Sequence, residues 1–168
     1  LALIRAGASN VLLSVLRHHI PHASTCEVAF NTLWELAGNM DIHADLIAAE
    51  AEVIILRIMR THIQHLGIAL HGCKLLKNLA KHATSEYVLM QAGTGDILLE
   101  TMRRHSSHEG TCEIACGALC ELEWNLDNHV DIAMVEAREV IIQTIRRHLQ
   151  QVGVTLYGCK LLKSFAGH

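Results

Sequence analysis

The chain has 168 residues, of which 51% are hydrophobic and 4% aromatic, and its formal net charge is −3. The hydrophobic content excludes a disordered tail or linker, and the slightly acidic balance argues against a nucleic-acid-binding domain, which is expected to be basic. No apolar stretch approaches the ~18 residues of a membrane-spanning helix, so we expect no membrane insertion. The single proline, Pro21, permits many helices and argues against an all-β protein.

The predicted elements are helices, and those between residues 42 and 80 are the clearest. A short apolar helix is predicted over residues 42–49, and a second helix with an i, i+1, i+4, i+5 apolar face follows it. A third, longer helix comes next, and Gly67 is expected to precede it at a turn. The apolar positions that define the second and third helices are Ile54, Ile55, Ile58, Met59, Ile68, Leu75, Leu76 and Leu79.

Turn and capping residues predict the same three-helix pattern in the rest of the chain. Gly7 and Gly93 fall between a first and a second helix, where a sharp turn is needed. Thr25 and Thr111 are plausible N-caps of a third helix. Gly153 is expected to precede the last third helix, as Gly67 does in its own segment.

The sequence repeats itself. A shift of 86 residues gives about 35 identities over 82 overlapping positions without any gap, and residues 72–77 recur as 158–163. A weaker register at 43 residues aligns His19, His62, His105 and His148. The chain therefore divides into four units of two alternating kinds, at about 1–39, 40–82, 83–125 and 126–168.

Units of about 43 residues with one short and two longer helices fall within the roughly 40–47 expected of HEAT or armadillo repeats. The sequence resembles the armadillo family in the segments 91–93 (Gln-Ala-Gly), 98–99 (Leu-Leu), 102–103 (Met-Arg) and 72–80 (Gly-Cys-Lys-Leu-Leu-Lys-Asn-Leu-Ala). This resemblance implies an all-α fold, a right-handed solenoid of four three-helix repeats. It also implies a protein that binds other proteins along a concave face lined by the third helices.

The resemblance also implies where a partner lies. Nuclear-import adaptors of this family carry a Trp and, four residues later, an Asn on each third helix. The corresponding pairs here are Asn31 with Glu35, Lys74 with Asn78, Gly117 with Glu121, and Lys160 with Ser164. Only Asn78 matches, so we do not expect recognition of nuclear-import signals.

Charged residues alternate at these positions instead. Glu35 and Glu121 mark units one and three, whereas Lys74, Lys77, Lys160 and Lys163 mark units two and four. One interpretation is a groove that reads a partner of mixed charge, in which case Lys74→Glu with Lys160→Glu weakens binding. The other is a solvated polar face, which every amphipathic helix needs.

Each second helix ends in basic residues, and stacked units would align them in a stripe. Cations at a helix C-terminus complement the helix dipole, which is the simplest interpretation. The alternative is a pH-tunable surface for an acidic partner, because histidine titrates near neutrality. The arginines of this stripe are Arg17, Arg60, Arg103, Arg104, Arg146 and Arg147.

Thirteen histidines and six cysteines invite a metal hypothesis. The densest group runs from His105 and His108 through Cys112 and Cys116 to Cys120, and the cysteines at four-residue steps form a stripe along one helix. A stripe does not converge on one point as a zinc site requires. We therefore expect no metal or cofactor, and expect all six cysteines to be small buried residues in a reducing, cytoplasmic setting, with the nucleus as an alternative.

Two repeated acidic motifs, Asp41 with His43 and Asp45, and Asp127 with His129 and Asp131, lie at helix starts. Acids there stabilise the helix dipole, although the pattern also suits a cation. We find no phosphate-binding glycine loop, nucleophile elbow, HExxH or kinase motif, and expect no enzyme.

The sequence therefore favours a protein-interaction scaffold or adaptor. The alternatives are the repeat region of a larger regulatory protein and, less favoured, a His/Cys metal- or cofactor-binding protein. Self-association through exposed ends of the solenoid is a further expectation.

Overall fold

The computed structural model describes residues 3, 6–39, 42–81, 83–122 and 131–166. The described residues form ten helices and no strand, which confirms the predicted all-α class. The helices are α2 (Ala8–His18), α3 (Ala23–Leu36), α4 (His43–Ala48), α5 (Ala51–Thr61), α6 (Leu66–Ala80), α7 (Ala83–Gln91), α8 (Thr94–Arg104), α9 (Glu109–Glu121), α10 (Asp131–Arg147) and α11 (Val152–Ala166).

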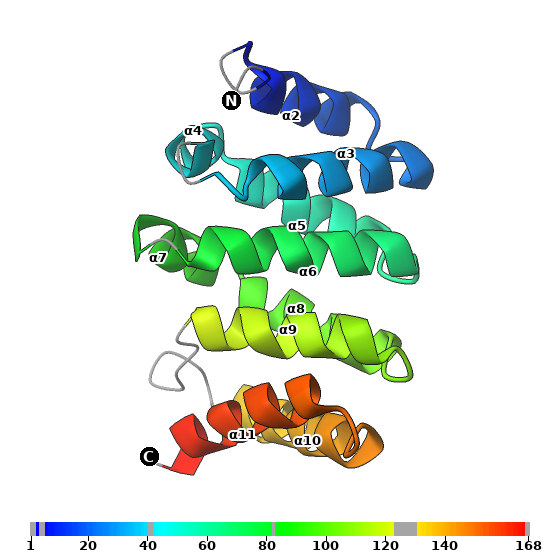
Figure 1. Ribbon diagram of the computed structural model, residues 1–168, viewed down its shortest axis with the longest axis vertical. Coiled ribbons are helices and arrows are strands. Elements are labelled where there is room, and N and C mark those ends of the chain that lie inside the picture. Colours follow the sequence, from blue (N-terminus) through cyan, green and yellow to red (C-terminus); the bar gives the residue numbers. More distant parts are fainter. Residues whose placement is uncertain (1–2, 4–5, 40–41, 82, 123–130, 167–168) are drawn as a thin grey trace.

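The helices lie in two rows. The front row consists of α3, α6, α9 and α11, each packed on the next, and these are the helices predicted as third helices (Figure 1). The back row consists of α2, α5, α8 and α10, which also contact one another in order. We refer to α2–α3, α4–α6, α7–α9 and α10–α11 as layers one to four.

Turns between the first and second helices follow the prediction where the chain has glycine. Gly7 and Gly93 precede α2 and α8 with φ angles of 76° and 79°. Such left-handed backbone costs glycine little because it has no Cβ. Glu50 takes the same place before α5 with a φ of 52°. Among the described residues, it is the one residue other than glycine that has a positive φ.

Layer four departs from the prediction. The separate first and second helices expected there form one continuous helix from Asp131, and Glu136, which aligns with Gly7 and Gly93, lies inside it. Glutamate alone does not explain the continuous helix, because Glu50, 86 residues earlier in the repeat, holds positive-φ backbone before α5. The side chain of Glu136 also forms an ion pair with Arg103 of α8, at 3.2 Å.

The expected turns at Gly67 and Gly153 were wrong, because α6 begins at Leu66 and α11 at Val152. Both glycines lie in the first turn of their helices. A Cβ at residue 67 would overlap the carboxyl group of Glu27, and one at residue 153 would overlap that of Glu113. These glycines therefore allow a close approach to the preceding front-row helix.

The expected caps at Thr25 and Thr111 were also wrong. The helices begin earlier, and His22 and His108 are the N-cap residues. Nδ1 of His108 accepts a hydrogen bond from the Thr111 amide at 3.2 Å, and Nδ1 of His65 accepts one from the Ile68 amide at 3.4 Å. Imidazole nitrogen thus takes the role that the prediction gave to a hydroxyl.

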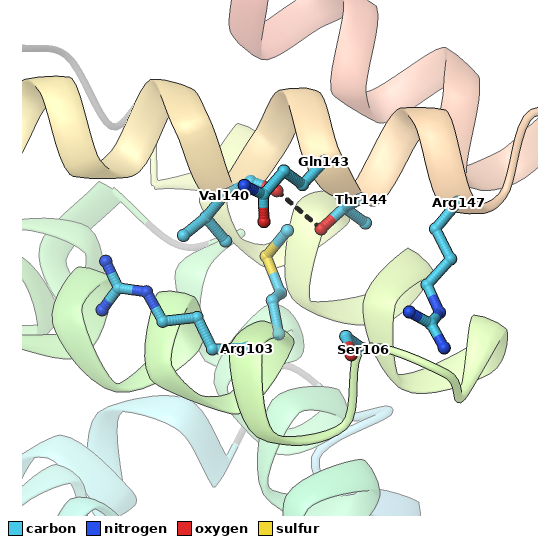
Figure 2. Close-up of a pocket in the computed structure, with 7 residues that line it drawn as sticks. Arg103, Ser106, Val140, Gln143, Thr144 and Arg147 are labelled. Atoms are coloured by element: carbon cyan, nitrogen blue, oxygen red, sulfur yellow. Dashed lines mark hydrogen bonds between the residues drawn. The ribbon is translucent and has the colours of Figure 1, made fainter.

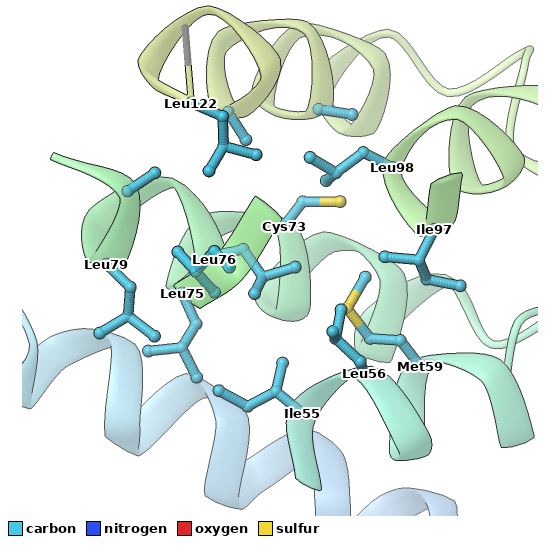
Figure 3. Close-up of a cluster of buried hydrophobic side chains, with 14 of the residues drawn as sticks. Ile55, Leu56, Met59, Cys73, Leu75, Leu76, Leu79, Ile97, Leu98 and Leu122 are labelled. Atoms are coloured by element: carbon cyan, nitrogen blue, oxygen red, sulfur yellow. The ribbon is translucent and has the colours of Figure 1, made fainter. Parts of the chain in front are cut away.

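One continuous aliphatic core joins the layers. Figure 3 shows its middle, where Leu75 and Leu76 of α6 lie among buried side chains that include Ile55 of α5 and Leu98 of α8. Cys73, Cys112 and Cys116 are fully buried and Cys26 is buried, as predicted. Cys120 is half-buried and Cys159 exposed, so the expectation of six buried cysteines was wrong. Cys73 lies under α9, whereas no described helix covers Cys159 on α11.

Histidines at the ends of the back-row helices connect each layer to the one before it. Nε2 of His62, His105 and His148 bonds to the carbonyl oxygens of Ile20, Ile63 and Ser106, at 2.6, 2.8 and 2.8 Å respectively. A carbonyl oxygen only accepts, so each ring donates from a protonated Nε2. We call these bonds the histidine rungs.

Candidate functional site

The residues predicted to line a groove all lie on the front row. Asn31 and Glu35 on α3, and Lys160, Lys163 and Ser164 on α11, are exposed. Lys74, Lys77 and Asn78 on α6, and Glu121 on α9, are half-buried. The front row thus collects the predicted residues on neighbouring helices.

Three of the four lysines among them lie against aromatic rings. Nζ of Lys74 is 4.2 Å from the centroid of the Trp34 ring, across the contact between α3 and α6. Nζ of Lys77 lies 4.5 Å, and Nζ of Lys160 5.5 Å, from the centroid of the Tyr157 ring. An ammonium group within about 6 Å of an aromatic ring is attracted by its electron-rich face. We call these five residues the aromatic–lysine cluster.

Lys77 and Tyr157 belong to helices that are separated by α9. Nζ of Lys77 nevertheless donates a hydrogen bond to the Tyr157 hydroxyl, at 3.2 Å. Gly117 of α9 leaves the space, because a Cβ there would lie 2.6 Å from Nζ of Lys77 and 3.4 Å from Cε2 of Tyr157. The front-row surface is therefore recessed at Gly117, and the side chains of Lys77 and Tyr157 from the two flanking helices meet over this glycine.

The charges around this point are mostly positive. In the part of the chain that the structure describes, Lys77 and Lys160 have no carboxylate within ion-pair distance. Burial raises the pKa of the neighbouring Cys120 thiol, Lys160 and Lys77 oppose that shift, and Glu121 adds to it. Both ammonium groups therefore act on the same small region of the front row.

The sequence interpretation missed Trp34 and Tyr157. Trp34 aligns with Lys77 in the 43-residue register. Tyr157 precedes Lys160 by three residues, the spacing that places two side chains on one helix face. The signal available in the sequence was an aromatic residue that aligns with a groove lysine or lies one helical turn from one.

The basic stripe acts largely within the protein. Nη2 of Arg17 donates to the carbonyl of Ala49, the C-cap of α4, at 2.6 Å, and Nη2 of Arg60 reaches the Ala92 carbonyl at 3.5 Å. These arginines therefore bond to helix ends in the following layer, and they also lie in the last turns of their own helices.

The other arginines of the stripe differ from one another. Arg103 pairs with Glu136 across layers at 3.2 Å, and Arg104 pairs with Glu100 on its own helix at 2.6 Å. The hydrogen bond from Arg104 is the chief cause that lowers the pKa of Glu100, and Arg103, whose Nη1 lies 3.5 Å from the Glu100 carboxylate, adds to it. Arg146 and Arg147 are exposed on α10.

A cavity of about 210 Å³ lies between α8 and α10. Figure 2 shows Arg103 and Arg147 at its two ends, with Gln143 and Thr144 between them. The Thr144 hydroxyl donates to the Val140 carbonyl at 2.8 Å, so it is used within its own helix. The residues lining this cavity include no histidine, cysteine, aspartate or glutamate, so they offer no acid–base pair.

Within the described ranges, no group of three or more His, Cys, Asp or Glu side chains is arranged to hold a metal ion. In the predicted stripe, the Cys112 thiol points to the backbone carbonyl of His105 at 3.6 Å. His43 is buried, with Nε2 bonded to the Ala37 carbonyl at 2.8 Å, beyond the end of α3. Asp41, Asp127, His129 and the side chain of Asp131 lie outside the described residues.

No helix among the described residues has both the length and the apolar character needed to cross a membrane. Comparison with known proteins gave no family model, no curated protein and no solved structure that matches this chain.

Proposed function

We propose that this chain is an armadillo-like, right-handed solenoid of four repeats that serves as a protein-interaction scaffold or adaptor. The repeats would be residues 1–39, 40–82, 83–125 and 126–168. The 86-residue sequence repeat and the ordered contacts within the front and back rows support this proposal. A partner peptide or helix would lie along the front row, on the face that carries the aromatic–lysine cluster.

The observation that carries the proposal is this cluster on an accessible face. Aromatic rings supply large contact area at a low cost in conformational entropy, and they are common among residues that dominate binding energy. Trp34 and Tyr157 are two of the six aromatic side chains of the chain, and both remain partly exposed. Lysines that lie against them combine charge with this contact area. Such chemistry suits contact with a partner, and we propose binding without catalysis.

A peptide library displayed on phage tests this function. Panning against the chain is expected to enrich peptides that bind it, and Trp34→Ala combined with Tyr157→Ala is expected to remove most of that binding. Val53→Ala is the matched control, because Val53 is 52% exposed on back-row helix α5. Failure to enrich any peptide, or equal loss in the control, would contradict the proposal.

Self-association through the outer layers stays a second proposal. Val28 of α3 in layer one is 67% exposed, and Leu156 of α11 in layer four is 51% exposed. Both residues lie on front-row helices. Exposed apolar side chains of this kind favour contact with another apolar surface. Sedimentation velocity over a range of concentrations is expected to show larger species that Val28→Glu removes. A monomer at every concentration would rule this association out.

A further inference from the structure

We propose that Lys77, Tyr157 and Lys160 form one anion-binding position above Gly117, which holds a carboxylate side chain of the bound partner. This inference rests on the proposed function and names the chemistry that one part of the partner must carry. The three side chains come from α6 and α11, and Lys77 and Tyr157 meet because α9 has glycine between them.

The hydroxyl group of Tyr157 can donate a hydrogen bond to an anion. Its hydroxyl accepts a hydrogen bond from Nζ of Lys77 at 3.2 Å, so the hydroxyl proton remains available to an acceptor. A hydroxyl that accepts from a charged donor becomes a stronger donor itself, because chains of hydrogen bonds polarise one another. Tyr157 therefore has a polarised O–H that it can donate to an anion.

Both ammonium groups have donors left for an anion. Each lysine has three N–H donors. Lys77 uses one on Tyr157, and Nζ of Lys160 lies 5.5 Å from the same ring without a carboxylate partner among the described residues. Two positive charges thus flank one phenol. A carboxylate has two oxygens with about four acceptor sites, enough for the phenol and both lysines.

The position occurs once on the front row. In the 43-residue register, the residues that align with Tyr157 are Val28, His71 and Ile114, and none of them is a phenol. The nearest counterpart is His71, whose pKa is lowered by burial and by Lys74, so it is a poor source of positive charge. We therefore infer that the partner places one acidic side chain near layers two to four, and that this contact does not recur in every layer.

Titration of the whole chain with fluorescent oligoglutamate tests this inference, with oligoglutamine as the neutral probe and oligophosphoserine as the phosphate probe. Oligoglutamate is expected to bind and oligoglutamine to bind more weakly. Lys77→Met and Lys160→Met are each expected to weaken oligoglutamate binding by about fivefold, the upper range for exposed ion pairs. Tyr157→Phe is expected to weaken it by about threefold, since it removes one hydrogen bond and keeps the ring.

Arg57→Met is the matched control, because it removes one positive charge from back-row helix α5, where Arg57 is exposed. It is expected to leave oligoglutamate affinity nearly unchanged. The amide resonance of Gly117, followed by NMR on the isotope-labelled chain, is expected to shift with oligoglutamate, whereas that of Gly38 at the end of α3 is expected to stay in place. Circular dichroism of each variant checks that it folds.

Equal affinity of Lys160→Met and Arg57→Met, or an unmoved Gly117 resonance, would overturn the anion position. So would binding of oligophosphoserine without binding of oligoglutamate, because the position is assigned to a carboxylate. If library peptides bind the front row but Lys77→Met and Lys160→Met do not affect them, this inference fails and the proposed function stands. If no peptide binds at all, the proposed function fails as well.

Discussion

Replacement of His105 tests whether the histidine rungs stabilise the stack of layers. His105 is 9% exposed, and its Nε2 donates to the Ile63 carbonyl, which belongs to the preceding layer, at 2.8 Å. His105→Phe keeps a planar ring of similar shape but removes the donor. The lost hydrogen bond and the partly buried carbonyl left without a donor together cost about 1–2 kcal/mol.

This loss is measurable as a change in melting temperature. For a domain of this size, 1 kcal/mol corresponds to roughly 2–4 °C, so His105→Phe is expected to lower the Tm by about 2–8 °C. His105→Gln, whose amide nitrogen lies near the position of Nε2, is expected to restore part of the loss. Thermal unfolding followed by circular dichroism at a fixed pH measures both variants.

His19 provides the matched control. It aligns with His105 in the 43-residue register, but it is exposed, and its ring contacts that of His22 edge-on at 5.6 Å. His19→Phe is expected to change the free energy of unfolding by less than about 0.5 kcal/mol, as surface substitutions usually do. Equal changes in Tm for His19→Phe and His105→Phe would refute the reasoning, because they would remove any special role of the bond between layers.

Three further substitutions test packing, titration and capping. Gly72→Ala places a Cβ 2.6 Å from Sδ of buried Met59. The resulting overpacking costs about 1–3 kcal/mol, which exceeds the roughly 1 kcal/mol gained in helix propensity. A lower Tm is therefore expected for this variant. Burial raises the pKa of Glu52, which is 5% exposed, above the ordinary value of 4.5, with a smaller contribution from Glu50. The stability that protonated Glu52 contributes is therefore fully present below pH 4.5 and is lost as the pH rises through the folded-state pKa of Glu52. Urea unfolding is expected to show that the free energy of unfolding of Glu52→Gln rises relative to that of the wild type over the same pH window. A constant difference between the two proteins at all pH values would contradict this assignment. Arg17→Met removes the 2.6 Å bond to the Ala49 carbonyl, and amide hydrogen exchange is expected to become faster in α4, by about threefold, for an exposed bond of roughly 0.5–1 kcal/mol.

The helices were predictable because apolar side chains recur at helical spacing throughout the chain. The short helix expected over residues 42–49 is observed as His43–Ala48. Gly7 and Gly93 could be placed at turns because glycine accepts positive φ at little cost. Glu50 holds a similar backbone without being glycine, so local preference alone does not locate that turn. Contacts with neighbouring helices decide such positions.

What the sequence could not show is which side chains meet across layers. Gly67 looks like a turn in isolation, but the structure uses it to accommodate the carboxyl group of Glu27, which is 40 residues earlier. The 43-residue register aligns His62 with His19 but does not show that Nε2 of His62 bonds to the Ile20 carbonyl of the preceding layer. Both contacts depend on how layers pack, and a pattern along one chain does not contain that information.

The candidate site could be predicted only in part, because some of its contacts also join different layers. The lysines of the front row could be found from the repeat, because they recur at aligned positions. Their pairing with aromatic rings could not, since Tyr157 reaches Lys77 across a helix that lies between them. The decisive residue there is Gly117, whose contribution is the absence of a side chain.

The unequal burial of the cysteines gives the chain a built-in attachment point for a reporter dye. Burial raises the pKa of Cys112 to about 11 and that of Cys116 to about 12, and Cys73 is raised further still, so these thiols stay protonated and unreactive in neutral buffer. Cys159 is exposed and directly precedes Lys160 on α11. A thiol-reactive fluorophore will therefore attach there first, beside the aromatic–lysine cluster, and a partner arriving on the front row can be followed by its emission without adding a cysteine.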